Sequence, residues 1–502
     1  MKKSVLKLTV GITALAAMSA FAQTQPATTS PAPRTAPPPA APGPIEQTIQ
    51  EIKNPVPWLT WGGDLRLRNE YGDNLITLNE NAAHHEQDYF RFRERIWASA
   101  MPLTNVSVNA RFSGEQREWM DPSYASQYGA RTGLEERYGI LDNAFVKWSN
   151  IADMPLTISA GRQDVQFGDP LNWWLVGDGT PGDGSWTFFL DSIRATYNAQ
   201  EIKTKFDLVY IYQNAYPDEW IPTLGRSSDN HVPGSAAPAP YYLTEQNEQG
   251  VILYGSNKSV KNTQIDGYFI YKRDNKERPN GDNADIYTLG AKVSGTPAEH
   301  WLYSVEGAYQ FGSKQDATVG TDYINSPTDW RSIGAYGANG KLTYAFKDEL
   351  NNQVSLISEY LSGDNPNTKG RDEMFDILWG RWPRWSELYI YSYISETSRK
   401  IAQMNNIVRV GPSWSCTPVK DTTFSATYNA LFAPESTPTR EASATLFSHS
   451  GNFRGHYLQT VLKHQFNKHI SGHLWGECIW MGDYYAHRDL MSFLRAEVLF
   501  TF

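Results

Sequence analysis

The connections between the amphipathic strands of this chain alternate in length. From about Trp58 to Phe502, segments with a period of two are joined in turn by very short polar links and by long polar stretches. The short links are Pro102–Thr104, Asn150–Met154, Asn198–Glu201, Asn257–Lys261, Gly295–Glu299, Lys347–Asn351, Thr417–Lys420 and Asn467–Lys468. The long stretches include Tyr71–Glu86, Gln213–Glu245 and Asp364–Gln403. A soluble sandwich has no reason to keep every second connection short, whereas a transmembrane barrel has tight periplasmic turns and long outer loops.

The last strand shows the alternation most clearly. One face of Ser492–Phe502 carries Leu494, Ala496, Val498, Phe500 and Phe502, and the other carries Arg495, Glu497 and Thr501. Apolar side chains on one face and charged ones on the other are what lipid outside and water inside require. The terminal Phe502 also resembles the final aromatic residue of bacterial outer-membrane barrels.

We therefore predict an all-β fold, a transmembrane antiparallel β-barrel of about 18 strands with long extracellular loops and short periplasmic turns. One further segment, Glu387–Ser395, looks like a strand, but a strand there would break the alternation. We assign it to the long loop after Gly363, as a local strand or a lid. Barrels of 16–18 strands leave a lumen wide enough for water and solute, so the predicted size favours transport.

The composition permits this fold although the chain looks soluble. Hydrophobic residues make up 40% and the mean hydropathy is -0.51, because half of each barrel strand faces a wet lumen. After the N-terminus there is no run of 18 or more apolar residues, which excludes membrane-spanning helices. Aromatic residues reach 13%, in keeping with interfacial girdles. Cys416 and Cys478 fall on strands that we expect not to be neighbours, so we predict no disulfide between them.

The N-terminus predicts the location. Lys2, Lys3 and Lys7 precede the apolar run Leu8–Ala17, and a small-x-small site ends at Ala22, so residues 1–22 read as a signal peptide. Residues 23–57 are rich in Pro, Ala and Thr and should form a disordered periplasmic tether, with a helical turn or two over Ile45–Ile52. Residues 58–502 form the barrel, which places the protein in the bacterial outer membrane. The formal net charge of -9 argues against nucleic acid as a partner.

Arginines recur on the predicted inner face of the first strands, and acidic residues alternate with them. These arginines are Arg66, Arg68, Arg91, Arg93, Arg95, Arg111 and, further on, Arg194. Guanidinium groups facing a lumen attract carboxylates or phosphates, often in bidentate fashion. The alternative is structural, since ladders of Arg and Glu brace a barrel without selecting any solute. Strict alternation turns Glu94 toward lipid, so we expect it near the rim or beside a bulge.

Several motifs resemble the alginate-export porin family. They are Gly161-Arg162-Gln163, Phe167-Gly168-Asp169, Trp173-Trp174, Phe189-Leu190-Asp191-Ser192-Ile193-Arg194 and Tyr360-Leu361-Ser362-Gly363-Asp364-Asn365-Pro366. The resemblance follows the order of the family over most of Trp58–Phe502. It implies an 18-stranded outer-membrane barrel with an arginine-rich constriction; the best-known member passes the polyuronate alginate out of the cell.

Two departures from the family pattern weaken the case for alginate itself. Pro170-Leu171-Asn172 stands where a basic residue usually follows the Gly-Asp step, and Thr187-Phe188 stands where an Arg usually precedes Phe-Asp. Arg162 should face outward by alternation, so we expect it near a strand end or after a bulge, turned into the lumen or a loop contact. The expected pore-lining, substrate-binding residues are Arg66, Arg68, Arg91, Arg93, Arg95, Arg111, Arg162, Arg194 and Asp191.

The predicted function is passage of anionic saccharides or a polyuronate-like polymer by electrostatically favoured diffusion. The partners are that oligo- or polysaccharide, outer-membrane lipid and, for polymer export, periplasmic machinery. Two alternatives stay open: a general or small-anion porin, and a barrel hydrolase, which would need a Ser or His nucleophile–base set. The histidines show no metal spacing; His464, His469 and His473 fit a polar rim, and we expect no cofactor. Asp364, Asp372 and Asn365 could chelate Ca²⁺ or simply form a solvated acidic loop.

Overall fold

The protein is described from a computed structural model. The described residues are 43–121, 133–167, 188–216, 243–315, 329–380, 383–397, 400, 403–438, 440, 441, 443 and 445–502. The predicted signal peptide and residues 23–42 of the tether lie outside them. The chain divides into two compact units, residues 1–50 and 51–502. Helix α2 spans Pro44–Lys53, which confirms the helical turns expected at Ile45–Ile52.

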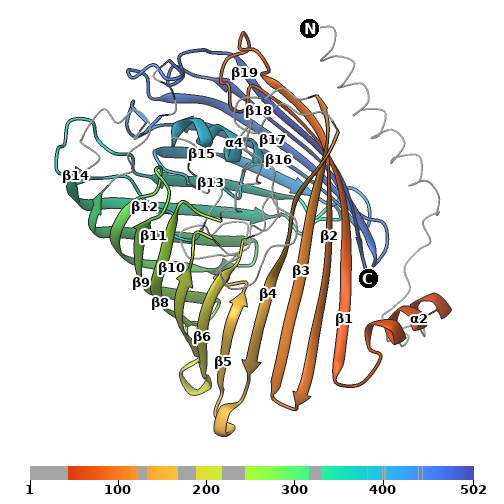
Figure 1. The fold of residues 1–502 in the computed structure, drawn as a ribbon. Coiled ribbons are helices and arrows are strands. Elements are labelled where there is room, and N and C mark those ends of the chain that lie inside the picture. Colours follow the sequence, from red (N-terminus) through yellow and green to blue (C-terminus); the bar gives the residue numbers. More distant parts are fainter. Residues whose placement is uncertain are drawn as a thin grey trace, which may run out of the picture. The chain divides into compact units, whose positions relative to one another are not determined.

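The second unit is a closed antiparallel β-barrel (Figure 1). Its strands are β1 (Leu59–Asp73), β2 (Glu86–Leu103), β3 (Val106–Asp121), β4 (Gly133–Trp148), β5 (Leu156–Gln163), β6 (Leu190–Ala199), β7 (Thr204–Gln213), β8 (Gln246–Asn257), β9 (Thr263–Lys276), β10 (Asn283–Ala298), β11 (Trp301–Gln315), β12 (Trp330–Ala345), β13 (Gln353–Leu361), β15 (Ile407–Cys416), β16 (Thr422–Phe432), β17 (Phe453–Gln465), β18 (Ile470–Met481) and β19 (Leu490–Thr501). Each strand pairs with the next, and β1 pairs with β19 to close the wall. The two-residue strand β14 (Arg371–Asp372) adds in parallel to β12 and is not part of the wall. The described wall therefore has the 18 strands that the sequence predicts.

The alternation of connection lengths is confirmed as well. All eight predicted short links join consecutive strands; two of them contain the 3-10 helices η1 (Ile151–Asp153) and η2 (Gln200–Ile202). The first wall strand begins and the last one ends at this short-turn end, because Asp64 of β1 lies opposite Thr501 of β19. An even number of antiparallel strands requires both ends to lie on the same side. Among the described helices, none is long and apolar enough to cross a membrane.

Burial along the strands is inverted relative to a globular protein. On β1, Leu65 is 57% exposed, whereas its neighbours Arg66 and Arg68 are 4% and 1% exposed. Exposed aromatic rings lie toward both ends of the outer wall, for example Trp148 and Trp414 near short turns and Trp330 and Trp480 near the long loops. This pattern is the lipid-facing apolar band with aromatic girdles that a transmembrane barrel requires. Cys416 and Cys478 are both free and lie on the non-adjacent strands β15 and β18.

Glu94 departs from what we expected. It lies in the middle of β2 on the outer wall between the exposed Phe92 and Ile96, and no bulge shifts the register there. Its carboxylate accepts a hydrogen bond from Nε2 of Gln116 at 2.8 Å and rests over Gly114, where a Cβ atom would stand 2.2 Å from it. The expectation of a rim or bulge position was wrong, because Gly114 leaves room for a polar pair on the wall itself.

The strand-like segment Glu387–Ser395 is a helix. Helix α4 (Glu387–Glu396) is buried along its whole length inside the barrel, near the inner face of β18 and β19 (Figure 1). Ser386 caps its N-terminus by accepting a hydrogen bond from the backbone N–H of Tyr389 at 3.1 Å. A segment away from the wall has no strand to pair with, so only a helix satisfies its backbone internally. The expected local strand was therefore wrong, but the assignment to the loop after Gly363 was right.

Candidate functional site

The arginines predicted on β1 and β2 meet on the inner wall of the barrel. Arg93 and Arg95 share Asp64, at 3.0 and 2.6 Å. Arg91 binds Glu115 at 2.6 Å and Glu70 at 3.3 Å. Arg66 lies 3.9 Å from Glu115, and Arg68 pairs with Glu497 of β19. All five side chains alternate with outward-facing neighbours on β1 and β2, and a role for them in lining a solute path stays a prediction.

Two further arginines complete this group, which we call the arginine ladder. Arg117 of β3 binds Glu115 at 3.2 Å, and Arg495 of β19 binds Glu70 at 2.8 Å. The sequence signal for both was the same alternation, because each stands between outward-facing neighbours on its strand. The ladder joins seven arginines (Arg66, Arg68, Arg91, Arg93, Arg95, Arg117 and Arg495) to four strand-borne carboxylates (Asp64, Glu70, Glu115 and Glu497). Cations therefore outnumber carboxylates on this part of the described wall.

The remaining predicted arginines lie on β3, β5 and β6. Arg111 bridges Asp142 at 2.8 Å and Asp164 at 2.9 Å. Arg194 binds Asp207 at 2.9 Å and lies over the ring of Phe167, 5.0 Å from its centroid. These two are separate from the arginine ladder, since their carboxylate partners Asp142, Asp164 and Asp207 lie on β4, after β5 and on β7.

Arg162 is turned inward by a change of backbone conformation at the preceding residue. Gly161 has a φ of 126°, a region that L-residues with a Cβ atom rarely adopt. Beyond it, the guanidinium of Arg162 binds both carboxylate oxygens of Asp191, at 2.8 and 3.1 Å, and lies 4.1 Å from the ring centroid of Phe189. The predicted residues Arg162 and Asp191 are thus brought together at the strand ends. The motif residues Gly168-Asp169 and Trp173-Trp174, and the departures at 170–172 and Thr187, lie outside the described residues.

Each predicted arginine contacts at least one carboxylate. Such buried pairs are costly to break, since removing one partner leaves an uncompensated charge at about 3–5 kcal/mol. The ladder and the pairs on β3, β5 and β6 therefore brace the inner wall. The arginines of the ladder still outnumber its carboxylates when Glu387 of α4, which binds Arg495, is included.

A long loop between β13 and β15 enters the barrel. We call residues 362–406 the crossing segment. On one side, Asp376 lies 3.4 Å from Nζ of Lys272 on β9, and its backbone N–H donates to Gln310 of β11 at 2.8 Å. Trp379 is fully buried against Gly250 of β8, where a Cβ atom would stand 2.5 Å from the indole.

On the other side, α4 is attached to β17, β18, β19 and β2. The backbone N–H groups of Glu387 and Leu388 donate to Glu477 of β18, at 2.9 and 3.2 Å, so a carboxylate compensates the helix N-terminus. Glu387 binds Arg495 at 2.7 Å. At the C-terminal end, Glu396 binds Arg454 of β17 through two hydrogen bonds of 2.6 and 2.8 Å.

The two sets of attachments lie on opposite parts of the ring of strands, because β9 and β19 are half-way round from each other. The crossing segment therefore spans the lumen. A third attachment of the crossing segment is the ion pair between its Lys400 and Asp282, which lies between β9 and β10. Asp282 also pairs with Lys314 and with Arg440. Burial raises the pKa of Asp282, but Lys400, Lys314 and Arg440 outweigh it and hold that pKa well below its usual range.

The candidate calcium ligands are occupied by the protein's own cations. Asp364 and Asp372 are each 1% exposed and share Arg331, at 2.7 and 3.1 Å, and Asp372 also binds Lys314 at 3.1 Å. Neither expectation for these residues was right: they form a buried ion-pair cluster, not a solvated loop or a carboxylate cage. Across the described ranges, no group of three His, Cys, Asp or Glu side chains could hold a metal ion. His464 and His469 flank the last short turn and bind Thr422 and the Thr501 carbonyl.

Comparison with known proteins supports the fold and a family. A sequence profile of the family described as alginate export matches residues 242–496, about half of the chain. That stretch includes the motif Tyr360–Pro366 but not the motif around Arg162. No curated protein sequence matches the chain.

Two solved structures share the fold. The crystal structure of Acinetobacter baumannii OccAB2 is 9% identical, with a TM-score of 0.52 over 88% of this chain and 98% of that one. That of Acinetobacter baumannii OccAB1 is 10% identical, with a TM-score of 0.52 over 88% of this chain and 96% of that one. At such identities the similarity shows a common barrel fold and nothing about cargo.

Proposed function

The chain belongs to the alginate export family, and from that premise we propose that this outer-membrane channel passes anionic saccharides, as oligomers or as a polyuronate-like polymer. Diffusion through the lumen is favoured by the guanidinium groups of the inner wall. The observation that carries the proposal is the arginine ladder, in which seven arginines share four strand-borne carboxylates. A positive lumen wall raises the local concentration of carboxylate-bearing solutes and repels cations.

The crossing segment supports the same proposal. It narrows the lumen at the height of the ladder, because Glu387 of α4 binds Arg495, and Tyr391 of α4 contacts Tyr89 of β2 at 2.8 Å between the hydroxyl oxygens. A narrowed passage beside an excess of cations is where charge selection is most effective. A general porin of the same fold is the second candidate, and a hydrolase is less compatible with the family.

The test uses Arg93→Gln. Among the described residues, Arg93 forms an ion pair with Asp64 alone, and Asp64 keeps Arg95 at 2.6 Å, so the substitution leaves no carboxylate without a cation. In planar bilayers under a KCl gradient, the reversal potential should show anion preference in the wild type and shift toward cations in the variant. Lys347→Gln is the matched control, because it removes one positive charge at an exposed short turn outside the lumen.

Block of the current by saccharides separates the two candidates. Oligogalacturonate should reduce the wild-type current at concentrations where a neutral maltooligosaccharide of equal length does not. Equal block by both sugars, together with a reversal potential at zero, would leave only the general porin.

A further inference from the structure

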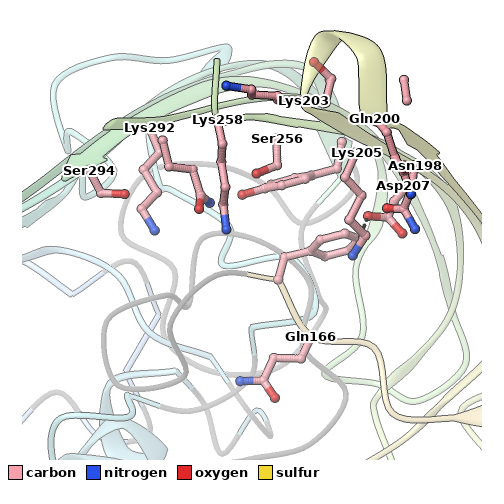
Figure 2. A pocket seen from close by; sticks show the side chains of 15 residues that line it. Gln166, Asn198, Gln200, Lys203, Lys205, Asp207, Ser256, Lys258, Lys292 and Ser294 are labelled. Carbon is pink, nitrogen blue, oxygen red and sulfur yellow. Dashed lines mark ion pairs between the residues drawn. The ribbon is translucent and has the colours of Figure 1, made fainter. Parts of the chain in front are cut away.

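A cavity at the short-turn end of the barrel is lined by a group of lysines. It measures about 830 Å³ and is lined by residues from the ends of β6 to β10 and by Gln166 and Phe167, which follow β5 (Figure 2). This end faces the periplasm in an outer-membrane barrel. The cavity is apart from the arginine ladder, which lies on β1, β2, β3 and β19.

Four lysines line the cavity, against one carboxylate. They are Lys203, Lys205, Lys258 and Lys292, and the carboxylate is Asp207. Asp207 is already engaged by Arg194 at 2.9 Å and by the hydroxyl of Thr196 at 2.5 Å, besides Lys205 at 3.3 Å. The ammonium groups of Lys203 and Lys258 form no ion pair with any residue that the structure describes. Lys292 lies opposite Asp266 of β9 and Glu306 of β11, so the excess positive charge of the cavity comes from Lys203 and Lys258.

A backbone hydrogen bond joins the two turns that carry Lys203 and Lys258. The N–H of Lys258, in the turn after β8, donates to the carbonyl of Lys203, in the turn after β6, at 2.9 Å. Figure 2 shows the ammonium groups of Lys205, Lys258 and Lys292 pointing inward on the side of Gln166, while Lys203 lies along the rim. A lysine is a compact charge on a flexible stem, so such a group can follow a moving anion without fixing one geometry.

A stack of buried aromatic rings borders the same cavity. The rings of Phe167 and Tyr254 stack with centroids 4.6 Å apart and planes at 28°, and Tyr254 stacks in turn on Tyr268 at 5.9 Å. Arg194, over Phe167, fixes the outer ring. These rings are buried and their faces are covered by one another, by Tyr268 and by Arg194, so the groups left to contact a sugar are polar. The amide of Gln166 and the hydroxyl of Ser256 can bond sugar hydroxyls.

We propose that this lysine vestibule is a binding site for a short segment of a carboxylate-bearing saccharide at the periplasmic mouth. The lysines bind the carboxylates, and Gln166 and Ser256 bond sugar hydroxyls. The inference rests on the proposed function, because it takes an anionic saccharide to be the cargo. It adds that the cargo is held at the mouth, at a place distinct from the arginine ladder.

The test measures binding apart from transport. Full-length protein in detergent is titrated with a hexamer of galacturonate by isothermal calorimetry in 50 mM salt, with maltohexaose as the neutral probe. The variant is K203Q/K258Q, whose two lysines sit in turns, so the strand pairing of the wall is untouched. An exposed charge pair is worth up to about 1 kcal/mol, so each lysine should account for about a fivefold change and the pair for about 25-fold. Lys347→Gln, a lysine at another short turn, should bind like the wild type.

The outcomes separate this inference from the proposed function. The vestibule is supported if K203Q/K258Q loses affinity for the galacturonate hexamer, Lys347→Gln does not, and 1 M salt abolishes binding to the wild type. Wild-type affinity in K203Q/K258Q with weakened binding in Arg93→Gln would overturn the vestibule and leave the anion channel standing. Equal binding of the galacturonate and maltose hexamers by the wild type would overturn both. Inorganic sulfate competing as well as the hexamer, charge for charge, would reduce the site to a simple anion site and contradict the role of Gln166 and Ser256.

Discussion

Replacing Glu396 by Gln should loosen the crossing segment from the barrel wall. The Glu396 carboxylate receives two hydrogen bonds from Arg454, at 2.6 and 2.8 Å, and one from the hydroxyl of Tyr484, at 3.1 Å. Both charged side chains are almost completely buried. The glutamine keeps the size of the side chain but leaves Arg454 without its counter-charge.

The magnitude follows from that burial. Removing one partner of a buried ion pair costs about 3–5 kcal/mol. Arg454 keeps the carbonyl of Asn406 at 2.8 Å and lies over the ring of Tyr484, 4.3 Å from its centroid, so we expect the lower end of that range. About 3 kcal/mol changes the equilibrium between attached and detached α4 by about 10²-fold, since each 1.4 kcal/mol is a factor of ten.

Single-channel recording in planar bilayers measures the effect. Glu396→Gln should spend about 10²-fold more time in a level of higher conductance than the wild type. Tyr484→Phe is the matched control, because it keeps the Arg454–Glu396 ion pair and removes the 3.1 Å hydrogen bond to the same carboxylate, together with the longer bonds from Asn406 and Arg454 to the hydroxyl. It should change the occupancy about fivefold, for about 1 kcal/mol. Heat-modifiable migration in gels checks that the barrel is intact. An intact Glu396→Gln barrel with the wild-type level and dwell times would refute the reasoning that the segment narrows the lumen.

The remaining predictions concern stability. Because the pKa of Asp282 is depressed in the folded protein, its contribution is complete above the ordinary pKa of about 3.9 and is lost as the pH falls below it. The difference in free energy of unfolding between wild type and Asp282→Asn should stay constant from pH 8 to 5 and shrink below pH 4 in urea titrations from vesicles; a difference that falls already at pH 6 would contradict this assignment. Glu94→Leu should raise the free energy of unfolding by about 1 kcal/mol in the same assay, because it replaces a lipid-facing carboxylate by an apolar side chain. A decrease would show that the Glu94–Gln116 pair is covered by something other than lipid.

The barrel could be predicted from the sequence because its constraints are local and repeat. A wall strand needs an apolar residue at every second position, and consecutive strands need a short turn at one end, so both signals recur along the chain. The inward orientation of Arg66, Arg91 and Arg495 follows from the same period of two. Which carboxylate each arginine binds could not be predicted, because that depends on the register between strands far apart in sequence, such as β1 and β19.

The interior was harder to predict because its structure also depends on contacts between residues far apart in sequence. Leu388–Ile394 alternates and is rich in aromatic residues, which is a strand signal. The helix forms because Ser386 caps it and because Glu477, about 90 residues away, accepts its first N–H groups. The lysine vestibule was missed because its lysines come from separate turns and strand ends. Nothing in the sequence near Lys203 indicates that Lys258 is its neighbour.

The seam between β1 and β19 has a consequence for assembly. Across it, Arg68 meets Glu497 and Glu70 meets Arg495, so charges from the two extremes of the chain neutralise one another at the seam. Before the final strand is in place, Glu70 already has Arg91 on β2, but the ion pairs Arg68–Glu497 and Glu70–Arg495 do not exist. We therefore expect the last step of assembly to be cooperative: the pairing of β1 with β19 and the formation of these two ion pairs should occur together.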